Sequence, residues 1–219
     1  MKKNLLSRQQ KNFLNFFGSK PELYNSFYFS GGTALSHYYL QHRYSEDLDF
    51  FSDKEFQISE LNLFLASNKR SFGAEHIQFT QSFNRNIFFL SFAKTKKELK
   101  AEFTYYPFER IDKTKKDKNI SVDSVLDIAV NKVFTLTQQA RGRDYYDIYV
   151  ICKKYKFDFM DLLKKARQKF DYPINNIELG KNLVKVTSFL DDPILIKSIN
   201  RKDIEKYFLG LVKNLDILA

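Results

Sequence analysis

Apolar residues in the first half of the chain follow two different periods. Strand-like runs occur at residues 27–29, 47–51, 87–92 and 99–105. A lysine-rich turn separates the last two runs and predicts a hairpin. Amphipathic helical spacing occurs at residues 5–17, 33–41 and 58–69. This mixture of periods predicts an α/β module.

The second half of the chain is helical in pattern throughout. Helical spacing recurs at residues 121–139, 144–155, 158–170, 176–190 and 202–215. Between the halves, residues 112–119 are polar and charged and have no hydrophobic period. We therefore expect two domains, an α/β core with an N-terminal helix over residues 1–115 and a helical domain over residues 116–219.

Composition narrows the class of protein. The 219 residues are 43% hydrophobic, which is enough for a packed core. A single cysteine, Cys152, excludes an internal disulfide. No run approaches the roughly 18 apolar residues of a membrane span, and no secretory signal is evident. We expect a cytoplasmic protein with no membrane partner.

The formal net charge is +10, which favours a polyanionic partner such as RNA. The alternative is a general lysine bias without functional meaning. Two lysine runs flank the predicted strand at residues 99–105, and each run also fits a solvated loop. They comprise Lys94, Lys96, Lys97 and Lys100, and then Lys113, Lys115, Lys116 and Lys118.

The most informative stretch contains a glycine pair followed by two aspartates. Gly31 and Gly32 follow a strand-like run and open a helical stretch, and the backbone N–H groups of such a turn can hold a phosphate. Asp47 and Asp49 are one residue apart on a predicted strand, so their side chains point to the same face. Two such carboxylates form a hard oxygen site that suits Mg²⁺. A phosphate cradle beside a metal dyad is the minimum needed to move a nucleotidyl group.

Three further residues are candidates for the same site, each with a structural alternative. Glu102 lies on a neighbouring predicted strand and is either a third metal ligand or a surface partner of a lysine. Lys132 falls within or beside the apolar stripe of its helix, where it either extends to water or reaches a phosphate. Asp144 is either the N-cap of a helix or a group that contacts the nucleotide or orients Lys132, and Asp147 shares its face.

The remaining reactive side chains fit structural roles. His37, His42 and His76 lack metal-ligand spacing with Cys152, and the apolar neighbours of Cys152 indicate a core position. Ser45 is two residues before Asp47, so it lies either near the metal site or in an ordinary turn.

Taken together, these motifs resemble the AbiEii/MenT nucleotidyltransferase-like toxins of bacterial toxin–antitoxin and abortive-infection systems. The resemblance is carried by Ser30-Gly31-Gly32-Thr33-Ala34-Leu35, by residues 42–51, by Lys132, and by Arg143-Asp144-Tyr145-Tyr146-Asp147-Ile148-Tyr149. It implies a DNA polymerase β-type nucleotidyltransferase core with a C-terminal helical domain that completes the active-site cleft.

The resemblance also implies roles for individual residues. Asp47 and Asp49 would bind Mg²⁺, or Mn²⁺ in its place, with Glu102 as third ligand, although that strand acid is more often Asp in the family. Gly31, Gly32 and Thr33 would hold the triphosphate. Lys132 and Asp147 would complete the catalytic set, with Ser45 and Asp144 close to the nucleotide. In such systems a serine at the position of Ser45 can be an inhibitory phosphorylation site.

The leading hypothesis is an enzyme that transfers NMP from an NTP to RNA. The tRNA 3′ acceptor end is the expected target, which would block translation and growth, and a cognate antitoxin is the expected partner. A second hypothesis is transfer to a protein or a small molecule. A third is a non-catalytic module that binds nucleotide or antitoxin.

Overall fold

The computed structural model describes residues 5–93, 95–189 and 191–215. The chain divides into two compact units. The first comprises residues 1–39 and 45–124, and the second comprises residues 40–44 and 125–219. The predicted boundary at 115/116 therefore falls inside the first unit, and the structure places the change between Ser124 and Val125 instead.

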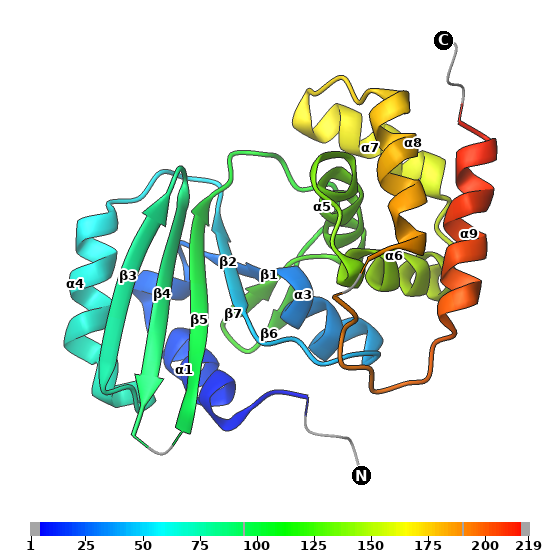
Figure 1. Cartoon of the computed structure of the whole chain (residues 1–219). Coiled ribbons are helices and arrows are strands. Elements are labelled where there is room, and N and C mark those ends of the chain that lie inside the picture. The colour runs from blue at the N-terminus through cyan, green and yellow to red at the C-terminus, as the bar shows by residue number, and fades with distance from the viewer. Residues whose placement is uncertain (1–4, 94, 190, 216–219) are drawn as a thin grey trace. The chain divides into compact units, whose positions relative to one another are not determined.

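A seven-stranded mixed sheet forms the first unit (Figure 1), with the strand order β3-β4-β5-β2-β1-β7-β6. The strands are β1 (Tyr28–Ser30), β2 (Leu48–Ser52), β3 (His76–Ser82), β4 (Arg85–Phe92), β5 (Thr95–Tyr105), β6 (Lys115–Asp117) and β7 (Ile120–Val122). The predicted hairpin is confirmed, since β4 and β5 pair antiparallel. β3 and the β6–β7 hairpin were not predicted from the sequence.

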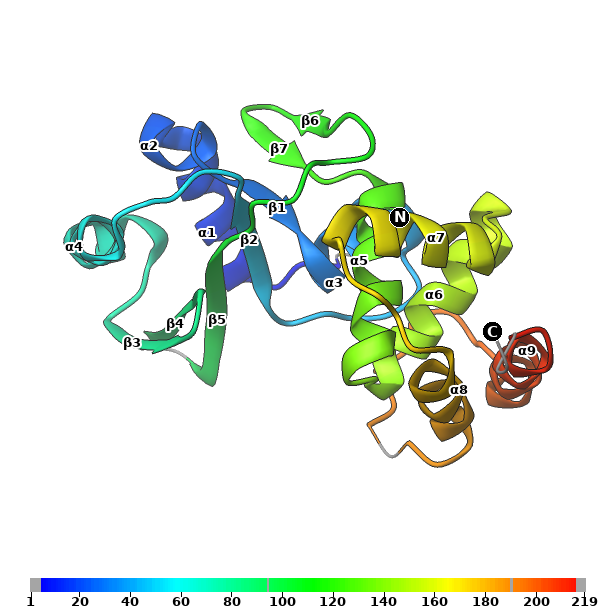
Figure 2. The ribbon, with the colours of Figure 1, turned by 90° about the horizontal axis from the view of Figure 1, so that it is seen from above.

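The helices of this unit are α1 (Arg8–Ser19), α2 (Pro21–Tyr24), α3 (Gly31–Ala34) and α4 (Ile58–Asn68), and a π-helical turn over Leu35–Leu40 follows α3. Figures 1 and 2 show α1 and α4 on one side of the strands. Phe17 stacks on Phe50 of β2 at 4.4 Å between ring centroids, and Phe50 stacks on Phe103 of β5 at 4.9 Å. These rings are fully buried, and each contributes about 1.5–3 kcal/mol by leaving water.

The other face of the strands is polar because side chains alternate along each strand. Leu48 and Phe50 of β2 point into the aromatic core, and Asp49 therefore points away from it. On β5, Ala101 and Phe103 are fully buried, while Glu102 lies beside Asp49 in the parallel β2–β5 register. The fold thus places the predicted acids on one sheet face.

The second unit contains α5 (Val125–Gln138), α6 (Gly142–Tyr155), α7 (Phe159–Phe170), α8 (Asn176–Val184) and α9 (Arg201–Lys213). These helices confirm the helical pattern predicted for the second half of the chain from Val125 onward, whereas residues 121 and 122, predicted to open the first helix, belong to β7. The segment Leu40–Tyr44 belongs to this unit because its backbone pairs with the segment before α9. The Tyr44 N–H donates to the Ile194 carbonyl at 2.9 Å, and the Ile196 N–H donates to the His42 carbonyl at 2.8 Å.

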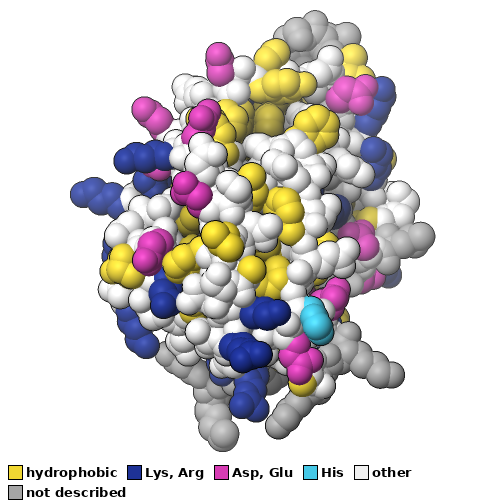
Figure 3. Space-filling model, turned by 90° about the vertical axis from the view of Figure 1, so that its left-hand side faces the viewer, with side chains coloured by type: hydrophobic (Ala, Val, Ile, Leu, Met, Phe, Trp, Pro, Cys, Tyr) yellow, Lys and Arg dark blue, Asp and Glu magenta, His cyan; other side chains and the backbone are white. Residues whose placement is uncertain are grey.

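Charged side chains of both signs are distributed over the face shown in Figure 3. Lysine and arginine side chains lie there among acidic and hydrophobic ones. The net charge of +10 is therefore not gathered into one continuous basic area on that face. Within the described residues, no helix is long and apolar enough to cross a membrane.

Candidate active site

The glycine turn and the second aspartate are in direct contact in the first unit. Ser30, the last residue of β1, pairs in register with Asp49. Gly31 follows with φ of 73°, and a Cβ atom built on it would lie 2.0 Å from Asp49 Oδ2. Only glycine combines this left-handed backbone with so close an approach to a carboxylate. The backbone of Gly31 therefore passes directly beside the Asp49 carboxylate.

The loop that carries Asp47 is anchored through three successive carbonyl groups. The Thr33 hydroxyl in α3 donates a hydrogen bond to the Asp47 carbonyl. Gln10 Nε2 in α1 donates to the carbonyls of Ser45 and Glu46 at 3.0 and 2.9 Å. Gln10 and Thr33 are both buried, so these donors are fixed in place. Thr33 in α3 and Ser45 in this loop, both predicted to bind nucleotide, thus take part in the hydrogen bonds that hold the loop of Asp47.

Glu102 is held by cations. Arg85, at the start of β4, binds it in bidentate fashion through Nε at 2.6 Å and Nη2 at 2.7 Å. Lys100 Nζ lies 3.1 Å from Glu102 Oε2 and 3.4 Å from Asp47 Oδ2. Burial alone would raise the pKa of the Glu102 carboxyl, but Arg85 and Lys100 lower that pKa below its usual value. Glu102 is therefore an ionised, fully paired carboxylate.

The donor set fits Mg²⁺ through the two aspartates. Mg²⁺ is usually bound by one or two carboxylates together with waters and substrate phosphates. Asp47 and Asp49 are half-buried and lie on the polar side of the strand. Within the described ranges, no three acidic, histidine or cysteine side chains are grouped so as to hold a metal ion. The geometry does not present Glu102 as a third ligand, because its oxygens face Arg85 and Lys100.

The second unit contains a buried ion network centred on Asp147 of α6. Arg43 contacts both carboxylate oxygens, through Nε at 2.6 Å and Nη2 at 2.7 Å. His42 Nε2 lies 2.6 Å from Asp147 Oδ1, and Lys132 Nζ lies 2.6 Å from Oδ2. Burial favours the neutral acid, but the charges of Lys132 and Arg43 hold the pKa of Asp147 well below its usual range.

Lys132 and Asp144 extend this network. Lys132 Nζ in α5 lies 2.9 Å from Asp144 Oδ1. The ammonium group of Lys132 is therefore paired with carboxylates and does not extend into bulk water. Burial opposes ionisation of Asp144, yet Lys132 and Arg141 lower the pKa of that carboxyl. The prediction of Asp144 as an N-cap is wrong, because α6 begins at Gly142 and Arg141 is its N-cap. Asp144 is instead the third residue of the helix, and its carboxylate accepts from the Arg141 N–H at 3.3 Å.

The predicted site residues therefore form two groups, one in each unit. Asp47, Asp49 and Glu102 share the sheet face of the first unit with the glycine turn. Lys132, Asp144 and Asp147 are joined by ion pairs in the second unit. The catalytic roles predicted for these residues remain predictions.

The partners of the predicted residues were not predicted from the sequence. Gln10 carried a signal, because serine followed three residues later by glutamine is the pattern of a capping box. The polar residues around Arg85 form no comparable sequence pattern that would indicate a contact with Glu102. His42, interpreted as a structural or surface residue, is fully buried against Asp147. Lys94 of the first lysine run lies outside the described residues.

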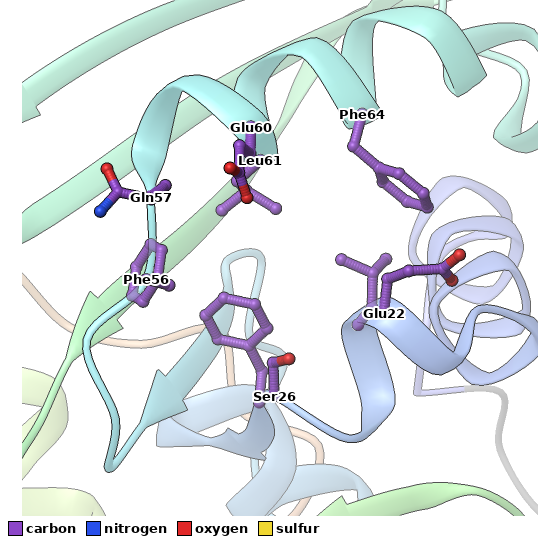
Figure 4. A pocket seen from close by; sticks show the side chains of 9 residues that line it. Glu22, Ser26, Phe56, Gln57, Glu60, Leu61 and Phe64 are labelled. Carbon is purple, nitrogen blue, oxygen red and sulfur yellow. The ribbon is translucent and has the colours of Figure 1, made fainter.

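Two other features contain none of the predicted site residues. Cys152 is buried, and burial raises the pKa of its thiol, which agrees with a core position. An apolar pocket of about 220 Å³ lies between α2 and α4 (Figure 4). Phe27, Phe56, Leu61 and Phe64 line this pocket, and Glu22 and Glu60 add two carboxylates.

Comparison with known proteins defines first the class and then the family. The Helicobacter pylori protein JHP933 has a crystal structure that covers 96% of this chain and 96% of its own, with a TM-score of 0.58 at 17% identity. Another H. pylori structure, described as a candidate nucleotidyltransferase, covers 98% of this chain and 99% of its own, with a TM-score of 0.59 at 18% identity. The fold is a nucleotidyltransferase fold of the DNA polymerase β type.

The family follows from the sequence itself. The model of the AbiEii family, described as nucleotidyl transferase AbiEii toxin of type IV toxin–antitoxin systems, matches residues 16–215. The chain belongs to this family, as the motifs predicted. The protein aq_aa25 of Aquifex aeolicus (strain VF5) is 28% identical over 187 residues, which are 84% of this chain and 82% of that protein. Membership implies an NTP substrate and an antitoxin partner.

Proposed function

We propose that this protein is a Mg²⁺-dependent nucleotidyltransferase toxin that transfers NMP from an NTP to the 3′ acceptor end of tRNA, in the cytoplasm, and so inhibits translation and growth. One observation carries the proposal. The Gly31 backbone lies against the Asp49 carboxylate, so a phosphate held by the glycine turn would lie beside the aspartate dyad.

The residues of the first unit have distinct roles in this proposal. Asp47 and Asp49 hold Mg²⁺, which neutralises the charge that develops on the phosphates when it is bound. The N–H groups of Gly31 and Gly32 bind and orient the triphosphate. Thr33 keeps the Asp47 backbone in place through its hydrogen bond to the Asp47 carbonyl. Mn²⁺, with similar oxygen preference, would substitute for Mg²⁺.

The reaction proposed is an exchange at the α-phosphorus. A ribose hydroxyl of the RNA forms the new O–P bond, the bond to the β-phosphate oxygen breaks, pyrophosphate leaves, and the hydroxyl proton passes to solvent. Lysine-rich segments support RNA as acceptor through phosphate contacts. In the second unit, Asp147 and Asp144 hold Lys132 by ion pairs, and we propose that this network fixes α5 against α6.

The experiment that tests the acceptor uses purified protein, Mg²⁺, total tRNA and each of the four α-³²P-labelled NTPs in turn. The proposal expects label on tRNA with one or two of the nucleotides, and none with Asp47→Asn. Label on a protein or a small molecule would overturn the choice of RNA while keeping the enzyme. Nucleotide binding without product under every metal would favour a non-catalytic binder.

A further inference from the structure

Glu102 has no acceptor capacity left for a metal ion. A carboxylate offers about four lone-pair sites. Oε1 accepts from Arg85 Nε at 2.6 Å and from the Thr104 hydroxyl at 3.3 Å. Oε2 accepts from Arg85 Nη2 at 2.7 Å, and Lys100 Nζ lies 3.1 Å from it. A metal at Glu102 would have to displace bonds from two cations at a side chain that is only 8% exposed.

Glu102 does not use all the donors of the two cations that hold it. Arg85 and Lys100 carry two positive charges, which balance the two carboxylates that they contact, because Lys100 Nζ lies 3.1 Å from Glu102 and 3.4 Å from Asp47. The Arg85 side chain is 50% exposed. Its bonds to Glu102 use Nε and Nη2, so Nη1 is directed outside the pair. An arginine held in this way keeps a fork of donors that suits a phosphate.

These cations share the sheet face of the aspartate dyad. Lys100 and Glu102 are two residues apart on β5, so their side chains share one face. β5 neighbours β2, and Arg85 of β4 pairs with Thr104 of β5. Neighbouring strands are about 4.8 Å apart. The charges of Asp49 and Asp47 contribute to the raised pKa of Arg85, after the larger effect of its hydrogen bond to Glu102. A phosphate bound at Arg85 would thus lie on the same sheet face as the dyad.

We propose that Glu102 is the anchor of a phosphate-binding pair, Arg85 and Lys100, and that the metal is held by Asp47 and Asp49 without it. This inference rests on the proposed function, which supplies the ligand class. The ligand is a phosphate group, and it has two sources, the polyphosphate of the nucleotide or the backbone of the RNA acceptor.

The test measures binding and needs no turnover. Mn²⁺ binding is followed by electron paramagnetic resonance. Binding of pyrophosphate and of a short single-stranded oligoribonucleotide is followed by calorimetry. The variants are Arg85→Gln, Glu102→Gln and Asp49→Asn. Arg70→Gln is the matched control, because Arg70 is exposed in the same unit.

We expect Glu102→Gln to bind Mn²⁺ like the wild type. Arg85→Gln should weaken the binding of one of the two phosphate ligands by about tenfold or more and leave Mn²⁺ binding unchanged. Loss of pyrophosphate binding assigns the pair to the nucleotide, and loss of oligoribonucleotide binding assigns it to the acceptor. Arg85→Lys should retain part of the binding.

Two results would overturn the inference. One is a loss of Mn²⁺ binding in a folded Glu102→Gln protein, and the other is an Arg85→Gln protein that binds both phosphate ligands as well as Arg70→Gln does. If Glu102→Gln fails to fold, phosphate binding by Arg85→Gln alone decides the test, because the Arg85 side chain is half-exposed and its replacement disturbs the core less. Unchanged Mn²⁺ binding in Asp49→Asn is a separate result that would count against the proposed function itself.

Discussion

Gly31 shows how one residue can fix the geometry of a site. Directly after β1 it adopts a positive φ, and its missing Cβ allows the backbone to meet the Asp49 carboxylate. Any other residue would bring both left-handed strain and a steric clash at the same atom. The identity of this residue is therefore dictated by the site.

Replacing Gly31 with alanine should destabilise the protein and weaken Mn²⁺ binding at the dyad. Left-handed backbone costs an alanine about 1–2 kcal/mol, and the clash with Asp49 adds to it. Gly210→Ala is the control, because Gly210 lies within α9 and a Cβ there meets nothing within 4 Å. Alanine there should be neutral or stabilise by about 0.5–1 kcal/mol. Urea unfolding checks both, and equal stability of the two variants would contradict this account.

Asp147 should make stability depend on acid pH. Its pKa in the folded protein is far below the value of about 3.9 in the unfolded chain, so the unfolded state binds more protons at acid pH. The stabilisation is fully present above about pH 4 and declines as the pH falls towards the folded-state pKa.

Asp147→Asn should therefore cost about 3–5 kcal/mol at pH 7, because Arg43 and Lys132 lose a buried counter-charge. The difference between wild type and variant should shrink as the pH falls below about 4. Urea unfolding at a series of pH values between about 7 and 3 measures it. A difference that is the same at both ends of that range would show that Asp147 acts through packing rather than charge.

Several of these residue positions follow from sequence and others do not. The shared direction of Asp47 and Asp49 follows from strand alternation, and the need for glycine at Gly31 follows from the turn. The partners of Glu102 depend on the β4–β5 register, which a hydrophobic pattern does not fix. The His42–Asp147 contact joins residues 105 positions apart, and no local pattern carries that information.

At the scale of elements, helix α1 both caps itself and anchors the loop of the dyad. Ser7 and Gln10 form a capping box, in which the Ser7 hydroxyl accepts from the Gln10 N–H and Gln10 Oε1 accepts from the Ser7 N–H. The Nε2 group of the same glutamine donates to Ser45 and Glu46. The start of the helix and the approach to β2 are therefore fixed by one side chain.

Ser7→Ala should cost about 1 kcal/mol, which is typical of a lost N-cap. Gln10→Leu should cost more, because it leaves the Ser7 N–H and the carbonyls of Ser45 and Glu46 without their partner. Ser59→Ala in α4 is the control and should stay within about 0.5 kcal/mol of wild type, since Ser59 is exposed. Chemical unfolding ranks the three. A Gln10→Leu protein as stable as Ser59→Ala would refute the anchoring role.

Other elements show where local patterns mislead. Residues 112–119 have the composition of a linker, yet Lys115–Asp117 forms an edge strand, where lysines protect against unwanted strand pairing. β3 is mostly polar and exposed, and its alternation is limited to the half-buried Ile77 and Phe79, which is too short to predict a strand. The helix predicted at residues 33–41 begins earlier, at Gly31, and continues as a π-helical turn over Leu35–Leu40.

For the whole molecule, the net charge of +10 makes RNA binding a salt-dependent property. If the second lysine run binds phosphates, replacing its four lysines with glutamine should make the slope of log K against log salt shallower. The expected change is about 0.7 for each phosphate of a single-stranded RNA that the variant no longer neutralises. Binding titrations between about 50 and 200 mM salt measure this slope.

The control carries the same change in charge at four exposed lysines of the second unit, namely Lys164, Lys202, Lys206 and Lys213. The slope should change less in this protein than in the variant of the second lysine run. Equal slopes in the two proteins would mean that net charge, and not the position of that run, governs RNA binding.

The most direct measurement of the central claim is the rate of nucleotidyl transfer by the wild type and by Asp49→Asn, at saturating NTP and Mg²⁺, with both proteins shown to be folded by circular dichroism. The account predicts transfer by the wild type and a loss of about a thousandfold or more in the variant, because one of the two carboxylates that hold the metal is gone. Transfer by folded Asp49→Asn within about tenfold of wild type would contradict the account.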